Sequence, residues 1–417
     1  MSQTDKPITQ RNIQQIGVVG GGTMGAGIAT SALLAGFEVI LLERNTETAQ
    51  QAADTAFSHL DGSVKRGKLA ADELAIIRHE RFRTTTDYAD LAAADLVIEA
   101  VFESEAVKQE VFGQLDAVCK PGAILASNTS YLDLNHIAQM TQRPQDVIGL
   151  HFFSPAHVMK LLEVVVGDNT AEEVVASSFT LAKRMGKVAV RSGVCDGFIG
   201  NRILSHYRKA LEGAVLAGAS PFAVDKALVD FGLAMGPFAV SDLSGLDIAW
   251  ANRKRLAASR NPQEQYAEFA DRLCEQGHFG RKTGRGYYIY NDGQPSPNPD
   301  LEHIIATERT AKGIVARDIS SAEIVDRYMA AMINEASRVV GEGIAQCPHD
   351  VDQTLLFGYG FPKAIGGPMH YADEVGLEKI LRDIERFSEE DAWLWQAAPL
   401  LKELQASGKN FSHLNSE

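Results

Sequence analysis

A glycine-rich turn near the N-terminus restricts the fold of this chain more than any other feature. The turn "GGGTMG" follows the apolar run "IGVV" and opens "TMGAGIATSALLAG", a stretch of small and apolar residues typical of a closely packed helix. The run "FEVILLE" comes next, so residues 16–43 predict a strand, a turn, a helix and a second strand. Gly36 stands where a helix is expected to end in a left-handed glycine. This order is that of the βαβ units found in nucleotide-binding folds.

The turn contains the pattern G-x-G-x-x-G as Gly20, Gly22 and Gly25. One glycine permits the tight turn, one lets the backbone approach a pyrophosphate, and one lets the helix pack closely on the strand. Glu43 ends the second strand at about the ~20-residue spacing of the acid that holds the ribose hydroxyls. An acid there favours NAD over NADP, whose extra phosphate it would repel, although Arg44 could reduce that repulsion. The alternative is a plain strand-to-helix turn with an exposed Glu43.

Further apolar runs indicate a largely parallel sheet within residues 1–190; they cover 95–101, 123–128, 147–153, 161–166 and 187–190. Later patterns are helical, and residues 223–247 resemble 350–377, so we expect two related helical domains at 191–290 and 321–417. The segment "NDGQPSPNPD" is rich in proline and polar residues and begins a predicted linker, 291–320. The predicted fold class is an α/β N-terminal Rossmann-type domain followed by two related all-α C-terminal domains.

The composition excludes several classes of partner. A formal net charge of −14 argues against nucleic acid and anionic membranes, and no apolar run approaches the ~20 residues that a bilayer span needs. The cysteines lie far apart without a CxxC pair, which argues against structural zinc and a disulfide framework; they are Cys119, Cys195, Cys274 and Cys347. The N-terminus is polar, without the features of a signal or transit peptide, so we expect the chain in the cytoplasm.

The segment "GLHFFSPAHVMKLLEVVVG" (149–167) places His151 and Glu163 in two apolar strands around a short proline turn. A buried carboxylate is costly unless it is paired. If the two strands lie side by side, each residue supplies the partner that the other needs. A carboxylate that accepts from the ring N–H fixes the tautomer and raises the basicity of the histidine. A core histidine without a catalytic role is the alternative.

Several motifs occur in the order found in L-3-hydroxyacyl-CoA dehydrogenases, and the chain resembles that family from about residue 14 to beyond 380. The motifs are "GVVGGGTMGAGIA", "VIEAVFESEAVKQEVF", "LASNTSYL", "GLHFFSPAHVMKLLEVV", "GFIGNRI", "MGPFAVSDLSGLD" and "GRKTGRGYYIY". The chain is most similar to the dehydrogenase half of peroxisomal-type multifunctional β-oxidation enzymes, which carry "HFFSPAHVMKLLEV" and a second C-terminal repeat. The resemblance implies NAD-dependent oxidation of L-3-hydroxyacyl-CoA to 3-oxoacyl-CoA.

The resemblance also implies roles for single residues. His151 resembles the family's catalytic base and Glu163 its orienting partner, while Ser130 and Asn201 resemble the polar pair that contacts the substrate oxygens and the nicotinamide region. The positions that match those surrounding NAD are Met24, Glu43, Val101, Glu103 and Lys108. Two simpler interpretations stay open: Ser130 caps the following helix, and Lys108 lies on a solvated helix face.

Two further sets of residues are candidate contacts, one for the cofactor and one for coenzyme A. Many family members have asparagine where this chain has Ser154, and a serine lacks the second hydrogen-bond donor of the asparagine amide. We keep Ser154 as a candidate cofactor contact because the dehydrogenase halves of the peroxisomal-type enzymes share this serine. Coenzyme A is a polyanion and needs a local basic cluster in so acidic a chain. The segment "SVKRGKLA" offers Lys65, Arg66 and Lys68 for the CoA phosphates, with a solvated helix end as the alternative.

The resemblance has limits that bear on partners. Only about fifteen residues precede the first predicted strand, so we expect no enoyl-CoA hydration here and a separate hydratase as a working partner. The C-terminus "SHLNSE" has no peroxisomal tripeptide. If the second repeat replaces the dimer contact of single-repeat dehydrogenases, the chain is a monomer; a homodimer is the alternative. Two other functions stay open: a λ-crystallin-like scaffold related to sugar-acid dehydrogenases, and an NAD-binding sensor without turnover.

Overall fold

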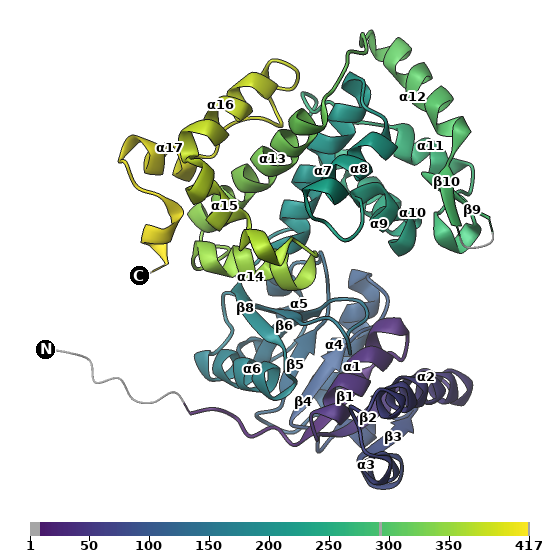
Figure 1. The fold of residues 1–417 in the computed structure, drawn as a ribbon. Helices are drawn as coiled ribbons and strands as arrows, with labels where there is room; N and C mark the ends of the chain where they lie inside the picture. Colours follow the sequence, from purple (N-terminus) through teal and green to yellow (C-terminus); the bar gives the residue numbers. More distant parts are fainter. Residues whose placement is uncertain (1–8, 292–293, 416–417) are drawn as a thin grey trace, which may run out of the picture. The chain divides into compact units, whose positions relative to one another are not determined.

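The structure is a computed structural model that describes residues 9–291 and 294–415. The chain forms two compact units, both drawn in Figure 1. The N-terminal unit comprises Met1–Asn201, Gly343–Gln346 and Phe357–Tyr359; the helical unit comprises Arg202–Glu342, Cys347–Leu356 and Gly360–Glu417. Within the described ranges, no helix combines the length and the apolar character that a membrane span requires.

The N-terminal unit is built around one eight-stranded sheet. Its strands are β1 (Gln15–Val19), β2 (Glu38–Leu42), β3 (Phe82–Thr85), β4 (Leu96–Glu99), β5 (Ile124–Ser127), β6 (Val147–Phe152), β7 (Leu161–Val165) and β8 (Val188–Ser192). Their order across the sheet is β3-β2-β1-β4-β5-β6-β7-β8, and all neighbours are parallel except β6 and β7. The predicted largely parallel sheet is confirmed. Strand β3 is absent from the prediction because its sequence, "FRTT", has one apolar residue and lies at the sheet edge.

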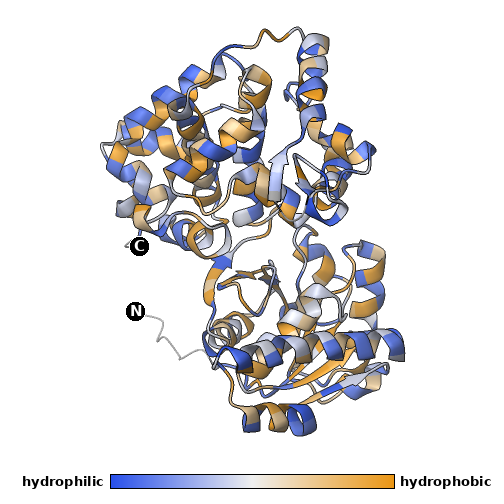
Figure 2. Ribbon diagram, turned by 45° about the vertical axis from the view of Figure 1, so that its right-hand side comes forward, coloured by the Kyte–Doolittle hydropathy of each residue, from blue (hydrophilic) through white to orange (hydrophobic). Residues whose placement is uncertain are grey.

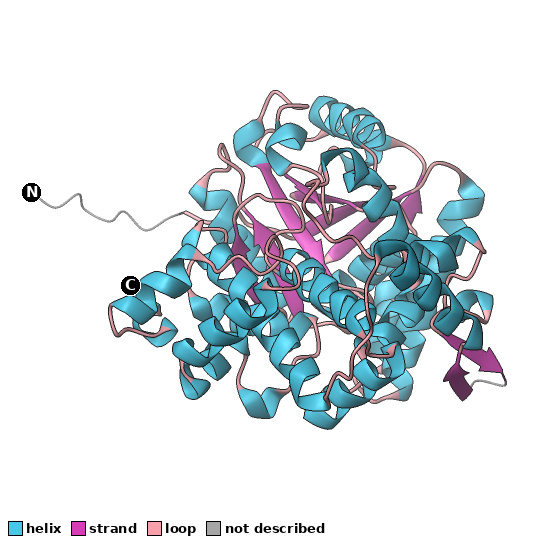
Figure 3. Cartoon of the chain, turned by 90° about the horizontal axis from the view of Figure 1, so that it is seen from above, coloured by secondary structure: helices cyan, strands magenta, loops and turns pink. Residues whose placement is uncertain are grey.

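Helices pack on both faces of this sheet, whose strands are drawn in magenta in Figure 3. They are α1 (Thr23–Leu34), α2 (Thr46–Lys65), α3 (Ala71–Ile76), α4 (Glu105–Val118), α5 (Leu134–Ala138) and α6 (Glu172–Arg184). Because successive strand residues point to opposite faces, Val18 joins a core with α1, α2 and α6, whereas Val19 joins a second core with α4 and α5. The strands are accordingly coloured mostly as hydrophobic in Figure 2.

The strand order reverses direction between β1 and β4, because β2 and β3 lie on one side of β1 and the later strands on the other. In sheets of this kind, ligands bind at the carboxyl ends of the strands where the order reverses. Two segments leave the sheet at that point: the glycine turn after β1 and residues 100–104 after β4. The topology therefore selects these two segments as the walls of a ligand site.

The helical unit packs around one long buried helix, α13, which contacts α8, α15, α16 and α17. Its helices are α7 (Gly200–Ala217), α8 (Pro221–Phe231), α9 (Pro237–Ser244), α10 (Leu246–Leu256), α11 (Phe269–Glu275), α12 (Pro299–Lys312), α13 (Ser321–Gly341), α14 (Pro348–Gly358), α15 (Pro368–Val375), α16 (Leu377–Ser388) and α17 (Pro399–Ala406). Because α13 packs on α8 as well as on later helices, both predicted helical domains share one unit. The division falls at Asn201 and not at residue 190.

The internal repeat is visible in matching helices and matching hydrogen bonds. Helices α8 and α14 each have 11 residues, α9 and α15 each have 8, and all four begin with proline. Asp225 on α8 accepts from two backbone N–H groups at the start of α9, both at 2.9 Å. Asp352 on α14 accepts in the same way from two N–H groups at the start of α15, at 2.8 and 3.3 Å. The same capping device therefore holds both copies of the repeat.

The predicted linker, 291–320, contains regular structure. Strands β9 (Tyr288–Asn291) and β10 (Gln294–Pro297) form an antiparallel hairpin, and α12 follows directly. The side chain of Asn298 caps α12, and Pro299 occupies the first turn, where no backbone N–H is needed. The prolines therefore begin a helix here instead of marking a flexible segment. Asp292 and Gly293 of the predicted linker lie outside the described residues.

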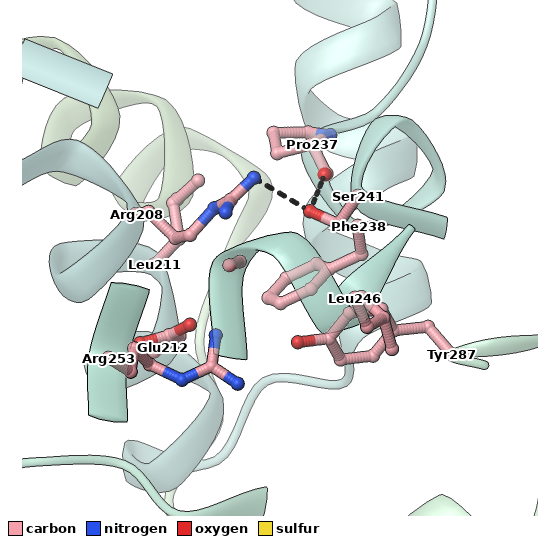
Figure 4. A pocket seen from close by; sticks show the side chains of 10 residues that line it. Arg208, Leu211, Glu212, Pro237, Phe238, Ser241, Leu246, Arg253 and Tyr287 are labelled. Atoms are coloured by element: carbon pink, nitrogen blue, oxygen red, sulfur yellow. Dashed lines mark hydrogen bonds between the residues drawn. The ribbon is translucent and has the colours of Figure 1, made fainter. Parts of the chain in front are cut away.

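A small pocket lies within the helical unit, lined by side chains of α7, α9 and α10 and by Tyr287 (Figure 4). On one side, Arg208 donates to Ser241 Oγ at 2.8 Å, and Ser241 donates to the carbonyl oxygen of Pro237 at 2.7 Å. None of the residues predicted to bind NAD or substrate lines this pocket. It belongs to the packing of the first repeat.

Glu212 is the unusual member of this pocket. Its side chain is 6% exposed, and no hydrogen bond reaches its carboxylate from any part of the chain that the structure describes. Burial raises the pKa of Glu212, and the attraction of Arg253 and Arg208 only partly opposes that rise. The folded chain therefore holds this proton more tightly than the unfolded chain does. By linkage, the stability from Glu212 is present at acidic pH and is lost as the pH rises through its raised pKa.

We predict that Glu212→Gln, which is neutral at every pH, raises the free energy of unfolding at neutral pH. The gain should disappear near pH 4.5, the ordinary pKa of a glutamate. Urea unfolding of both proteins at the two pH values measures this difference. Glu385→Gln, which removes an exposed carboxylate of α16, is the matched control and should show no such pH-dependent gain. A Glu212→Gln protein less stable than wild type at neutral pH contradicts the prediction.

Candidate active site

The glycine turn joins β1 to α1 at the carboxyl edge of the sheet. Gly20 has a φ of +94°, and a Cβ there would lie 2.8 Å from the carbonyl oxygen of Ala100. A Cβ on Gly25 would lie 1.7 Å from the carbonyl oxygen of Gly20, so only glycine allows this approach of helix to strand. Gly22 is exposed, has nothing within 4 Å of its Cβ position, and begins α1 without a side-chain cap. The N–H groups of the first turn of α1 are thus accessible to a pyrophosphate.

Glu43 lies beside this turn, directly after β2. Its Oε1 accepts from the Gly21 N–H at 2.6 Å, and its Oε2 accepts from the Arg44 N–H at 3.0 Å and from Thr48 Oγ1 at 2.9 Å. Burial alone would raise the pKa of Glu43, but these hydrogen bonds hold it below its ordinary value. The acid is therefore ionised and fixed beside the glycine turn, as the predicted binding of ribose hydroxyls requires. Glu43 is half-buried, so the alternative of an exposed Glu43 is wrong.

Val101 and Met24 border the same turn. The Val101 side chain lies 3.1 Å from the Cβ position of Gly20, and half-buried Met24 occupies the first turn of α1. The structure thus brings together the predicted NAD contacts from the two segments at the strand-order reversal. Their contacts with a cofactor stay predictions.

Lys108 is buried beneath the loop after β4. Its side chain is 1% exposed, and Nζ donates to both carboxylate oxygens of Glu99, at 2.7 and 2.8 Å, and lies 3.2 Å from Glu103 Oε2. The interpretation of Lys108 as a solvated helix residue is therefore wrong. Glu99 is fully buried and also accepts from Ser127 Oγ at 2.7 Å and from the Val101 N–H at 2.8 Å. This ion pair ties the ends of β4 and β5 to α4.

Glu103 connects that ion pair to the loop after β5. Its Oε1 accepts from Thr129 Oγ1 at 2.6 Å and from the Ser130 and Tyr131 N–H groups at 2.9 and 3.2 Å. Burial would raise the pKa of Glu103, but the charge of Lys108 and these hydrogen bonds lower it. Glu103 therefore acts in the structure mainly to hold the backbone that carries Ser130.

His151 and Glu163 face each other across β6 and β7. The two residues are paired in the antiparallel register, and His151 Nδ1 lies 2.6 Å from Glu163 Oε2. The predicted contact between them is present. Both side chains are buried, at 4% and 0% exposure, so the carboxylate is compensated by the imidazole. We assign the ring proton to Nδ1 because a carboxylate accepts only, which leaves Nε2 as the basic atom.

Ser130 and Asn201 complete the polar array. Ser130 Oγ lies 3.2 Å from His151 Nε2, on the side of the ring opposite Glu163. The interpretation of Ser130 as a helix cap is wrong, because Asp133 caps α5. Asn201 follows Gly200, whose N–H donates to Glu163 Oε1 at 2.9 Å. Glu163 therefore positions both the imidazole and the start of α7.

The turn before α7 is held in an uncommon conformation. Phe198 has a φ of +51°, a left-handed value that is rare for a bulky side chain. Its ring is fully buried and lies 5.7 Å from the ring of His151. Packing of this ring and the Gly200 hydrogen bond keep the turn in place, so Asn201 directly follows a strained connection.

The basic segment and Ser154 lie at the edge of the unit. Lys65, Arg66 and Lys68 are exposed at the end of α2. Ser154 is exposed next to a cis peptide bond with Pro155, and Ala156 beyond it packs on Gly27 of α1. The structure thus places Ser154 near the helix that carries the glycine turn. Contacts of these four side chains with CoA or NAD stay predictions.

Three functional features escape sequence reasoning. In the sequence, Glu99 is a single polar residue in an apolar strand, and Phe198 resembles an ordinary core residue. Tyr359 is a tyrosine at a helix end, far along the chain from Asn201, yet its hydroxyl donates to Asn201 Oδ1 at 2.8 Å. A signal existed for Glu99, since a carboxylate within "LVIEA" needs a buried partner just as Glu163 does. Within the described part of the chain, no group of three or more His, Cys, Asp or Glu side chains is arranged to hold a metal ion.

The fold and the site together define a Rossmann-type nucleotide-binding protein with a buried histidine–carboxylate pair. A family model described as "3-hydroxyacyl-CoA dehydrogenase, NAD binding domain" matches residues 15–195. A second, described as "3-hydroxyacyl-CoA dehydrogenase, C-terminal domain", matches residues 197–290 and again 324–412. The chain belongs to the 3-hydroxyacyl-CoA dehydrogenase family, and its cofactor is NAD. The double match of the C-terminal domain agrees with the repeat seen in the helices.

Individual relatives agree with this assignment. The chain is 42% identical over 414 residues to the peroxisomal bifunctional enzyme of Danio rerio, covering 95% of this chain and 57% of that protein. A solved structure of 3-hydroxybutyryl-CoA dehydrogenase from Escherichia coli K12 has a TM-score of 0.82 at 30% identity, covering 95% of this chain and 99% of its own. The dehydrogenase part of multifunctional enzyme 1 from C. elegans has a TM-score of 0.67 at 27% identity, covering 96% and 93%. The chain spans little more than half the length of the curated relatives it matches.

We predict that Lys108→Met destabilises the fold by about 3–5 kcal/mol, because it leaves the carboxylate of Glu99 buried without its cation. Urea unfolding measures the loss. Combining Lys108→Met with Glu99→Gln should recover most of it, since the buried charge is then absent.

Lys120→Met is the control for this experiment, because it breaks a half-exposed ion pair with Asp95. Such pairs contribute about 0–1 kcal/mol. If Lys108→Met costs no more than Lys120→Met, the Glu99–Lys108 pair does not hold the loops as described.

Proposed function

We propose that the chain catalyses the NAD-dependent oxidation of L-3-hydroxyacyl-CoA to 3-oxoacyl-CoA. The observation that carries the proposal is the buried pair of His151 and Glu163, 2.6 Å apart, whose outer ring nitrogen faces Ser130. A protein without catalytic activity does not require a buried histidine whose ring proton is held at Nδ1 by a carboxylate. Family membership supplies the substrate class, since the matched family is named for 3-hydroxyacyl-CoA.

Each residue of the site has a separate role in the proposed reaction. His151 Nε2 takes the proton of the substrate 3-hydroxyl, and Glu163 stabilises the imidazolium that forms, without itself being protonated. Ser130 and Asn201 hold the substrate oxygens so that carbon 3 is correctly oriented. NAD, when bound, accepts the hydride from carbon 3. The uncapped first turn of α1 would hold the pyrophosphate of NAD, and Glu43 would hold the ribose hydroxyls.

We predict that His151→Ala lowers turnover by ~100-fold or more, because the base is removed, and leaves the affinity for NAD nearly unchanged. Absorbance at ~340 nm with NADH and acetoacetyl-CoA measures turnover, and titration with NADH measures affinity. Near-normal turnover in this variant removes His151 from the role of base.

The same assay on the wild-type protein separates the competing functions. Turnover of acetoacetyl-CoA supports the proposal. Turnover only with a free sugar acid favours the λ-crystallin-like class, and NADH binding without any turnover favours a sensor.

We further propose that the end of α2 holds the phosphates of coenzyme A. Two observations support a basic cluster there. The rings of His59 on α2 and His157 are stacked with centroids 4.0 Å apart, and the pKa of His157 is lowered to about 4 by burial and then by the nearby charges of His59, Lys187 and Arg66. Burial and Lys160 lower the pKa of Lys187 to about 8. Both imidazoles are therefore uncharged at neutral pH. The cations near His157 are Arg66 and Lys187, with Lys160 acting on Lys187, and an anion of several charges would relieve their repulsion.

We predict that the triple variant Lys65→Glu, Arg66→Glu, Lys68→Glu raises the KM for acetoacetyl-CoA by about tenfold or more, since it replaces attraction to the phosphates by repulsion. The KM for NADH should not change. Lys402→Glu on exposed α17 controls for a general change of charge.

Acetoacetyl-pantetheine, which lacks the nucleotide phosphates of CoA, sharpens the comparison. The triple variant and the wild type should use it equally well. An unchanged KM for acetoacetyl-CoA, or an equal loss with the pantetheine thioester, rejects the phosphate site.

Compartment and assembly are also proposals. We propose that the chain is located in the cytoplasm, which the absence of a disulfide among the described residues supports. The named relatives are peroxisomal proteins. Recovery of the chain in organelles on cell fractionation would reject a cytoplasmic location.

We propose that the chain is a monomer, which is supported by the packing of the second repeat with the first in one unit. A mass of twice the monomer in light scattering rejects the monomer in favour of a homodimer. A separate hydratase would supply its substrate by adding water to an enoyl-CoA.

A further inference from the structure

A short segment of the second repeat belongs to the N-terminal unit. Residues Gly343–Gln346 and Phe357–Tyr359 fall within the second match of the C-terminal domain, yet they cluster with the sheet. The Gly193 N–H donates to the carbonyl oxygen of Ile344 at 2.8 Å, directly after β8. A Cβ on Gly358 would lie 2.4 Å from a methyl carbon of Leu161 on β7, so this part of the segment is packed tightly against the sheet.

Tyr359, at the end of this segment, contacts Asn201 directly and approaches His151 through Phe153. Its hydroxyl donates to Asn201 Oδ1 at 2.8 Å. Its ring packs edge-on against Phe153 at 5.5 Å between centroids, and Phe153 lies 4.4 Å from the ring of His151. A Cβ on Gly200 would lie 2.2 Å from the Tyr359 ring, so the tyrosine also covers the start of α7.

The direction of this hydrogen bond determines what Asn201 offers to a substrate. A carboxamide has an acceptor end, Oδ1, and a donor end, Nδ2. When Oδ1 accepts from the tyrosine hydroxyl, Nδ2 is the end that remains for a substrate oxygen. Both carbonyl oxygens of a 3-oxoacyl thioester are acceptors, so only the donor end can bind them. Without the tyrosine hydroxyl, the amide can rotate by half a turn and present the wrong end.

We propose that Tyr359 is a positioning residue of the dehydrogenase site, which orients the carboxamide of Asn201 with its donor end toward the substrate. The second helical repeat thereby contributes a side chain to the reaction in addition to its role in packing. This inference rests on the proposed function for its kinetic consequence, but the orientation of Asn201 stands on the structure alone.

Tyr359→Phe tests the proposal, because it keeps the ring contacts with Phe153 and Gly200 and removes only the hydroxyl. We expect kcat/KM for acetoacetyl-CoA to fall by roughly three- to tenfold, as for loss of one hydrogen bond. The affinity for NADH and the unfolding midpoint should stay at wild-type values. Tyr371→Phe, which removes a hydroxyl from α15 of the same repeat, is the matched control and should leave kcat/KM unchanged.

A double-mutant cycle with Asn201→Ala shows whether the effect passes through the amide. Once Asn201 is alanine, Tyr359→Phe should cause no further loss. An equal loss in both backgrounds means that the tyrosine acts by another route and overturns the proposal. Full kcat/KM in Tyr359→Phe overturns it as well.

A second measurement does not depend on turnover. With nitrogen-15 asparagine, the side-chain amide signals of Asn201 can be identified by their disappearance in Asn201→Ala. We expect Tyr359→Phe to shift or broaden these signals and Tyr371→Phe to leave them in place. Unchanged Asn201 signals in Tyr359→Phe reject the orientation. A wild-type protein without turnover rejects the proposed function only, because the amide signals still decide the role of Tyr359.

Discussion

The carboxylate of Glu163 is the interaction on which the rest of the site depends. It is fully buried in an apolar strand, and its two oxygens face two different parts of the chain, the imidazole of His151 and the N–H of Gly200. A buried charge is tolerated only when such partners are present. The condition that makes Glu163 compatible with folding therefore also holds the imidazole of His151 in one tautomer and fixes the start of α7, which carries Asn201.

A second buried carboxylate, Glu99, works by the same rule on the cofactor side. Its partners are Lys108, Ser127 and the N–H of Val101, which belong to three different segments at the carboxyl edge of the sheet. Glu103 continues this network to the backbone of Ser130, and Ser130 meets His151. Hydrogen bonds and ion pairs thus connect the loop after β4, which carries predicted NAD contacts, to His151, so one network positions both predicted sides of the site.

The helical repeats show how a duplicated element acquires a separate use. Both copies keep the aspartate that caps the next helix, Asp225 in the first and Asp352 in the second. The second copy then continues into a segment that packs on β7 and brings Tyr359 to Asn201. Shared packing requirements account for what the copies have in common, and the membership of Phe357–Tyr359 in the N-terminal unit accounts for this difference.

The sequence by itself determined the glycine turn, the alternation of strands and helices, and the pairing of His151 with Glu163. Each of these depends on a few neighbouring residues: a left-handed glycine, a run of apolar side chains, or two strands separated by one short turn. Only the tertiary structure decided that Lys108 is buried, that the proline-rich segment begins α12, and that Tyr359 reaches Asn201 across 158 positions of the chain. Contacts of that separation arise from tertiary packing within a unit, and no local pattern of hydrophobicity or backbone preference encodes them.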